Sequence, residues 1–124
     1  AKRSTERCAL FAPGTERMAV PYESLHDALR NNLLEAYLEP ILDLRSNSVG
    51  GYESLARWTT SDLGAIRPDV FIGLAEETGL IAELTRWSLN TSLRHASQVR
   101  ASGRPMHVSI NISPRVFGQR DIVA

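Results

Sequence analysis

The sequence predicts an α/β fold, because segments with the two-residue period of a strand alternate along the chain with segments of helical period. Alternating runs at residues 36–44 and 49–58 are separated by only four polar residues. Two segments with helical spacing follow, and a third alternating run occupies residues 106–113. Strands, then helices, then another strand form the repeating unit of α/β proteins.

The first predicted element is a short amphipathic helix that begins at Ser24. Leu25, Ala28, Leu29 and Leu33 recur at helical spacing, and Ser24 can cap the first turn through its side chain. Residues 1–23 show no sustained period before this helix, so they predict a linker or the tail of a preceding domain.

Residues 36–44 and 49–58 predict two strands of a hairpin. In the first run Leu38, Leu42 and Leu44 alternate with the neighbours Tyr37, Glu39, Ile41 and Asp43. The polar residues 45–48 are too short for a parallel crossover, which needs a dozen residues or more. An antiparallel arrangement is therefore expected.

Two further helices and a third strand complete the expected fold. Asp69 can cap a helix that stops at Gly79, since glycine adopts the left-handed closing conformation most easily. A longer helix is predicted from Ile81 to Val99, with Leu89, Leu93 and Ala96 on one side. The run from Met106 to Ser113 predicts the third strand.

Composition and charge exclude several classes of protein. The 124 residues carry 14 basic and 14 acidic side chains, so bulk charge gives no indication of binding to a nucleic-acid polymer or a membrane surface. The single cysteine, Cys8, excludes an internal disulfide and predicts a cytoplasmic location. The sequence holds no apolar run long enough for a membrane span, no glycine-rich phosphate loop and no Cys/His spacing typical of a metal site.

Polar side chains on the predicted strands form a candidate site. Glu53, Leu55 and Arg57 alternate on one face of the second strand, and Glu39 and Asn111 occupy corresponding positions on the first and third strands. Carboxylate and amide oxygens can bind a hard divalent cation, and the planar guanidinium group suits two phosphate oxygens. The set therefore suits metal-assisted chemistry on a phosphodiester.

Spacing alone leaves simpler interpretations of these residues open. A glutamate and an arginine on one strand face commonly form a surface ion pair of little energetic consequence. Asn111 at a strand end commonly hydrogen-bonds to neighbouring backbone. Trp58 and Trp87 are interpreted as core anchors. The three histidines, His26, His95 and His107, are interpreted as structural or exposed. Glu76 and Glu77 are interpreted as part of a solvated helix face.

Four blocks of sequence, in this order, resemble the EAL family of cyclic-di-GMP phosphodiesterases. They are residues 37–44 (YLEPILDL), 49–58 (VGGYESLARW), 71–81 (FIGLAEETGLI) and 108–113 (VSINIS). The resemblance covers residues 24–117, and the ordered set is more specific than the three-letter motif at residues 53–55. It implies that residues 24–124 are the N-terminal half of an EAL domain.

The resemblance implies a (β/α)8 barrel of the TIM type with an antiparallel first strand, and a site at the C-terminal ends of its strands. It further implies hydrolysis of cyclic di-GMP to linear pGpG with Mg²⁺ or Mn²⁺. Glu53 and Asn111 match metal-binding positions of the family. Leu55 and Arg57 match positions that contact the nucleotide, Arg57 through phosphate.

Two positions depart from the family pattern. Ser54 stands where the family usually has alanine, on the face away from the site, and little effect is expected. Glu39 stands where the family usually has a glutamine that contacts the ligand. A carboxylate next to Glu53 is expected to attract a metal ion and to repel a phosphate group.

The length of the chain is the larger departure, because a barrel of this type needs roughly 250 residues. The family's later acidic metal ligands and its catalytic lysine fall beyond Ala124, and Asp121 is the one acid after Asn111. The chain is therefore expected to be truncated and inactive alone, although the parent protein is expected to be a phosphodiesterase.

The sequence leaves alternative functions open. The chain could belong to a degenerate EAL module that binds cyclic di-GMP or a protein partner without catalysis, and Glu39 motivates that alternative. Half a barrel also leaves unpaired strand edges, which favour self-association. Residues 1–13 show a short resemblance to the closing end of a GGDEF domain, which would make the parent a tandem GGDEF-EAL protein of bacterial signalling.

Overall fold

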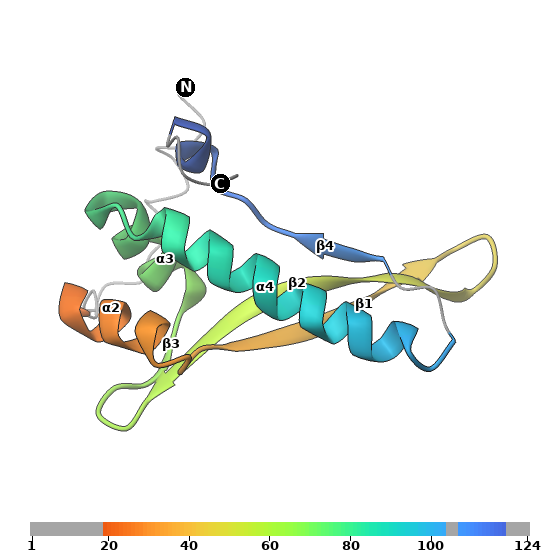
Figure 1. The fold of residues 1–124 in the computed structure, drawn as a ribbon, viewed down its shortest axis with the longest axis horizontal. Coiled ribbons are helices and arrows are strands. Elements are labelled where there is room, and N and C mark those ends of the chain that lie inside the picture. The colour runs from red at the N-terminus through yellow and green to blue at the C-terminus, as the bar shows by residue number, and fades with distance from the viewer. Residues whose placement is uncertain (1–18, 104–106, 119–124) are drawn as a thin grey trace, which may run out of the picture.

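The computed structural model describes residues 19–103 and 107–118. A four-stranded mixed sheet forms one layer, and the longest helix, α4, lies across one face of it (Figure 1). The observed α/β class confirms the sequence prediction. Cys8, Asp121 and most of the predicted linker at residues 1–23 lie outside the described residues.

Helix α2 (Tyr22–Arg30) packs against the core through Leu25 and Ala28, which are buried as its spacing predicted. The prediction that Ser24 caps this helix is wrong. The helix begins at Tyr22 directly after Pro21, and the amide of Ser24 donates to the Pro21 carbonyl at 3.1 Å. Proline already has the backbone angle that suits a helix start, so the chain turns earlier than the side-chain pattern indicated.

The predicted antiparallel hairpin is confirmed by β1 (Glu35–Asp43) and β2 (Ser48–Thr60), which pair along most of their length. The Asp43 carboxylate accepts a hydrogen bond from the Arg45 amide at 2.8 Å, and Asn47 adopts a left-handed conformation with φ of 52°. Asparagine tolerates that conformation better than most residues. The short polar turn therefore sets the register of the two strands.

A bulge next to the turn of the hairpin shifts this register by one residue. Ile41 pairs with Gly51 but Leu42 pairs with Val49, so Gly50 has no partner in β1. Between the bulge and the base of the hairpin, Glu39 lies opposite Glu53. The side chains of directly opposed residues in antiparallel strands project from the same face.

Two short strands pair with the side of β2 that β1 leaves open. Strand β3 (Gly64–Ile66), which the sequence did not predict, pairs antiparallel with the end of β2. Strand β4 (Val108–Ile110) pairs parallel with the middle of β2. It is shorter than the predicted strand at residues 106–113, of which Met106 lies outside the described residues.

Close approach of backbones fixes β4 against β2 at Gly51. A β-carbon at Gly51 would lie 3.1 Å from the carbonyl oxygen of His107. The neighbouring amide of Tyr52 donates to that same oxygen at 2.8 Å. A side chain at position 51 would therefore require the two backbones to shift apart by a few tenths of an ångström, so glycine suits this pairing.

Helices α3 (Pro68–Thr78) and α4 (Ile81–Arg100) follow the sheet and meet at Gly79, whose φ of 83° confirms the predicted helix end. The prediction that Asp69 caps α3 is wrong, because the helix already begins at Pro68. Asp69 instead forms a two-bond ion pair with the Arg67 guanidinium, at 2.7 and 3.0 Å.

The core lies between the helices and one face of the sheet. Trp58 is 3% exposed and meets the ring of Phe71 edge-on, with ring centres 6.0 Å apart, so its predicted role as a core anchor is confirmed. The predicted apolar side of α4 is wrong at Leu93, which is 63% exposed. Thr91 and Ser92 are buried on α4 instead, and the Ser92 hydroxyl is satisfied by the Ser54 hydroxyl of the sheet.

After β4, the described part of the chain ends with a short 3-10 helix, Pro114–Gly118. Its Val116 side chain is fully buried in the core. Over residues 19–103 and 107–118, no helix is long and apolar enough to cross a membrane.

Candidate functional site

Strand β2 separates the candidate site from the core, since its residues alternate between two faces. Ser54 and Trp58 are buried towards the helices, and the Ser92 hydroxyl donates a hydrogen bond of 2.7 Å to that of Ser54. Glu53 and Arg57 project from the opposite face and are half-buried. The predicted division of β2 into a core face and a site face is therefore confirmed.

Glu53 is the centre of the site, because both neighbouring strands bring polar groups to it. Glu39 on β1 is its partner in the ladder. Asn111, directly after β4, donates a hydrogen bond from Nδ2 to Glu53 Oε1 at 2.7 Å. The structure thus brings together three residues that the sequence predicted to share a surface, from three separate segments. The simpler interpretation of Asn111, a bond to nearby backbone, is not the one observed.

Arg57 lies four residues along β2 from Glu53, opposite Glu35 of β1. Its guanidinium is 5.7 Å from the centre of the Tyr37 ring and donates to the Ala56 carbonyl at 3.0 Å. Within residues 19–103 and 107–118 it makes no ion pair with Glu53. A guanidinium has five N–H donors, so a single backbone bond leaves it able to hold phosphate oxygens.

The donor set of this cluster suits a hard divalent cation. Glu53 offers carboxylate oxygens, and the Asn111 amide would offer Oδ1 after a half-turn of its end group. Glu39 adds a second carboxylate on the same face. Among the described residues, however, no group of three or more His, Cys, Asp or Glu side chains could hold a metal. The cluster therefore has the chemistry of a cation site with only part of its ligands.

A pocket of about 370 Å³ lies next to Asn111, between β2, the segment after β4 and helices α3 and α4. Leu55, Arg57 and Asn111 line it, together with Glu76 of α3 and Ser113. Three predicted site residues therefore border one cavity. The structure leaves the assigned roles of these residues as predictions.

Glu76 is the residue that the sequence did not assign to the site. It is half-buried, and the Ser113 hydroxyl donates to its Oε1 at 2.6 Å, whereas its neighbour Glu77 is exposed as predicted. One sequence signal, which Glu77 shares, points to this position. An acidic residue in the last turn of a helix opposes the helix dipole, so a second interaction is needed to explain it.

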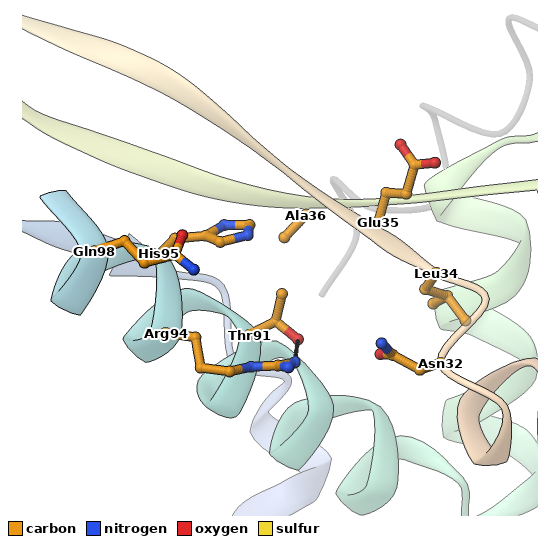
Figure 2. A pocket seen from close by; sticks show the side chains of 8 residues that line it. All are labelled: Asn32, Leu34, Glu35, Ala36, Thr91, Arg94, His95 and Gln98. Carbon is orange, nitrogen blue, oxygen red and sulfur yellow. Dashed lines mark hydrogen bonds between the residues drawn. The ribbon is translucent and has the colours of Figure 1, made fainter.

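A second pocket, of about 380 Å³, lies between α4 and the beginning of β1 (Figure 2). Figure 2 shows Arg94 extended along α4 with a hydrogen bond to Thr91, and His95 directed towards Ala36. The buried Nδ1 of His95 has no hydrogen-bond partner in the described part of the chain. None of the predicted site residues lines this pocket, so it is separate from the cluster around Glu53.

Comparison with known sequences gives a consistent set of relatives. Residues 22–124 match the model of the EAL domain family. The cyclic di-GMP phosphodiesterase NbdA of Pseudomonas aeruginosa is 35% identical over 102 residues, which cover 82% of this chain and 13% of NbdA. The cyclic di-GMP phosphodiesterase PdeR of Escherichia coli is 35% identical over 117 residues, which cover 91% of this chain and 18% of PdeR. The chain spans less than a fifth of the length of these relatives.

Solved structures give the same result. The PaMucR phosphodiesterase in complex with c-di-GMP superposes with a TM-score of 0.74 at 28% identity, over 82% of this chain and 41% of that one. The FimX EAL domain superposes with a TM-score of 0.71 at 25% identity, again over 82% and 41% of the two chains.

Proposed function

The chain belongs to the EAL domain family, and we propose that it contributes half of the active site of a phosphodiesterase that hydrolyses cyclic di-GMP to pGpG. The observation that carries this proposal is the hydrogen bond between Asn111 and Glu53, which unites two metal-binding positions of the family on one sheet face. Relatives named as cyclic di-GMP phosphodiesterases, at 35% identity, support the choice of substrate.

Glu53 and Asn111 would hold Mg²⁺ or Mn²⁺ through oxygen atoms. A cation bound there would polarise a phosphodiester and lower the pKa of a bound water. Leu55 and Arg57 border the adjacent cavity, where the side chain of Leu55 would contact the nucleotide and the guanidinium of Arg57 would hold a phosphate group. Binding of the cation and of the anion thus falls to different residues of the same strand.

The complete site needs groups that residues 19–118 do not supply. Further acidic ligands would complete the cation site, and the single lysine of the chain is Lys2. We propose that the full domain is a (β/α)8 barrel in which the β1–β2 hairpin and β4 form one part of the wall. We therefore expect the 124-residue chain alone to hydrolyse cyclic di-GMP at no measurable rate. Its cytoplasmic location and any preceding GGDEF domain stay predictions.

Turnover by the full-length protein tests this function. Cyclic di-GMP is incubated with the protein in Mn²⁺ and in EDTA, and pGpG is measured by chromatography. We expect pGpG only with the metal, and none from an E53A variant. The matched control is E23A, which removes an exposed glutamate in the first turn of α2 and is expected to keep activity. The absence of pGpG at every metal concentration would overturn the enzymatic function.

A binding module without turnover is the second candidate, because Glu39 places a carboxylate directly opposite Glu53. Two carboxylates on one face repel a phosphodiester and weaken productive binding. Saturable binding of cyclic di-GMP in EDTA, together with no pGpG in Mn²⁺, would favour this module over the enzyme. Isothermal titration and the turnover assay on one preparation separate the two.

A further inference from the structure

Asn111 lies outside any helix or strand, whereas Glu53, the other proposed metal ligand, lies within β2. Strand β4 ends at Ile110, so the ladder with β2 stops one residue before it. Its own bond to Glu53 is the contact that a cation would replace. Another interaction must therefore hold the backbone at residue 111 in place when the amide turns its oxygen towards a metal.

Ser113, two residues further on, is fixed from three directions. Its hydroxyl donates to Glu76 Oε1 at 2.6 Å and accepts a hydrogen bond from the Arg115 amide at 3.3 Å. Its carbonyl accepts from the amide of the fully buried Val116 at 3.1 Å. Because a hydroxyl group has one proton, the bond from the Arg115 amide leaves that proton for the Glu76 carboxylate.

Glu76 occupies a position that its own helix does not favour. It lies in the last turn of α3, where no basic residue balances it and where the helix dipole disfavours negative charge. The carboxylate is also half-buried, which costs free energy unless it is hydrogen-bonded. Exposed Glu77 shares the first disadvantage but not the second. A residue that violates local preferences and is satisfied by a distant partner is typical of a functional site.

We propose that Glu76 is a positioning residue for the metal site, acting through Ser113 on Asn111. The carboxylate anchors Ser113 to α3, and the two-residue span between Ser113 and Asn111 then holds the Asn111 amide over Glu53. The expected effect of Glu76 on cation affinity rests on the proposed function. The effect of Glu76 on the position of Asn111 does not.

The placement is tested in the metal-free 124-residue chain, with L42K and V49K at the exposed tip of the hairpin in every sample to keep the chain monomeric. The side-chain amide resonance of Asn111 is assigned in a ¹⁵N-labelled sample by its loss in N111D. We expect E76A and S113A to shift it, and E76Q to leave it close to the wild type, because the glutamine oxygen accepts the same bond. E77A is the matched control and is expected to leave it unchanged. S113A decides the result if E76A does not fold. An unshifted Asn111 resonance in the folded variants would overturn the proposal.

The consequence is tested by titration with Mn²⁺ alone, with free ion measured by electron paramagnetic resonance. Groups that hold a metal ligand in place typically account for about 10–100-fold in affinity, so we expect E76A to bind Mn²⁺ about tenfold more weakly and E76Q to recover most of this loss. Equal affinity of E76A and wild type would overturn the link to the metal. If the wild type shows no saturable binding, the proposed metal site fails, and the Asn111 resonance still decides the role of Glu76.

Discussion

Glu39 and Glu53 face each other across the hairpin, and this pair sets the charge of the site. Glu35 lies opposite Arg57 on the same face, so three negative charges there accompany one positive charge. The balance favours a cation at Glu53 and disfavours an anion beside it.

Replacing Glu39 with glutamine changes this balance without changing shape. We expect E39Q to bind cyclic di-GMP more tightly in EDTA, by up to about fivefold, because exposed charge pairs contribute only modestly. Isothermal titration at low salt measures it. E23Q, an exposed glutamate in the first turn of α2, is the control. Weaker binding by E39Q would show that the carboxylate accepts a hydrogen bond from the ligand.

The sequence predicted Glu53, Glu39 and Asn111 as neighbours because strand alternation and block order are local signals. The same signals could not reveal Glu76. Its partner Ser113 is 37 residues away, and α3 must pack beside the end of β4 before the two can meet. From the sequence alone, a glutamate pair near a helix end is interpreted as a solvated face, because the packing of α3 beside the end of β4 is not a local signal.

The strand that carries the site is attached to α4 by a buried pair of hydroxyl groups. Ser54 is 4% exposed and Ser92 is 1% exposed. Removing one hydroxyl leaves the other without its partner, so S54A is expected to reduce the free energy of unfolding by about 1 kcal/mol.

Urea denaturation of S54A, S92A and the double variant measures this coupling. The double variant is expected to lose less than the sum of the two single losses, because no hydroxyl then remains unpaired. S97A, exposed on the same helix, is the control. Strictly additive losses would mean that the two hydroxyls do not interact.

The end of α3 depends on backbone conformation at Gly79. Its φ of 83° lies in the left-handed region, so G79A is expected to cost about 1 kcal/mol. Gly73 lies inside the same helix with open space around its α-carbon, and G73A is expected to stabilise by a similar amount. Thermal melting of both variants gives opposite shifts in Tm; shifts of the same sign would contradict this account.

Helix ends and short strands were the elements that the sequence located least well. Pro21 and Pro68 start α2 and α3 through their fixed backbone angle, whereas capping patterns pointed to Ser24 and Asp69. Strand β3 has three residues, too few for an alternating pattern, and exists because it pairs with the end of β2. Gly79 was located correctly because a single residue determines that helix end.

At the scale of the whole molecule, the tip of the hairpin exposes apolar side chains. Leu42 and Val49 are cross-strand partners, each 51% exposed, and Leu44 is 87% exposed. Apolar side chains on an unpaired edge strand favour pairing with another chain. The resemblance to the EAL family, which the comparisons confirm, did not indicate which surface would be exposed in this way.

We therefore expect the 124-residue chain to self-associate at micromolar concentrations. Light scattering coupled to size-exclusion chromatography measures it, and L42K/V49K is expected to shift the chain towards monomer. L93K, on the exposed side of α4, is the control. A monomer at every concentration would contradict self-association through this strand.

The bond between Asn111 and Glu53 joins residues 58 positions apart, and this separation has a consequence for folding order. The β1–β2 hairpin closes locally and can form within microseconds, whereas the parallel pairing of β4 must wait until α3 and α4 have brought the chain back. We expect Glu39 and Glu53 to be opposed early, with no amide beside them to moderate their repulsion. The cation site would then be the last part of this chain to assemble and the first to open under denaturant.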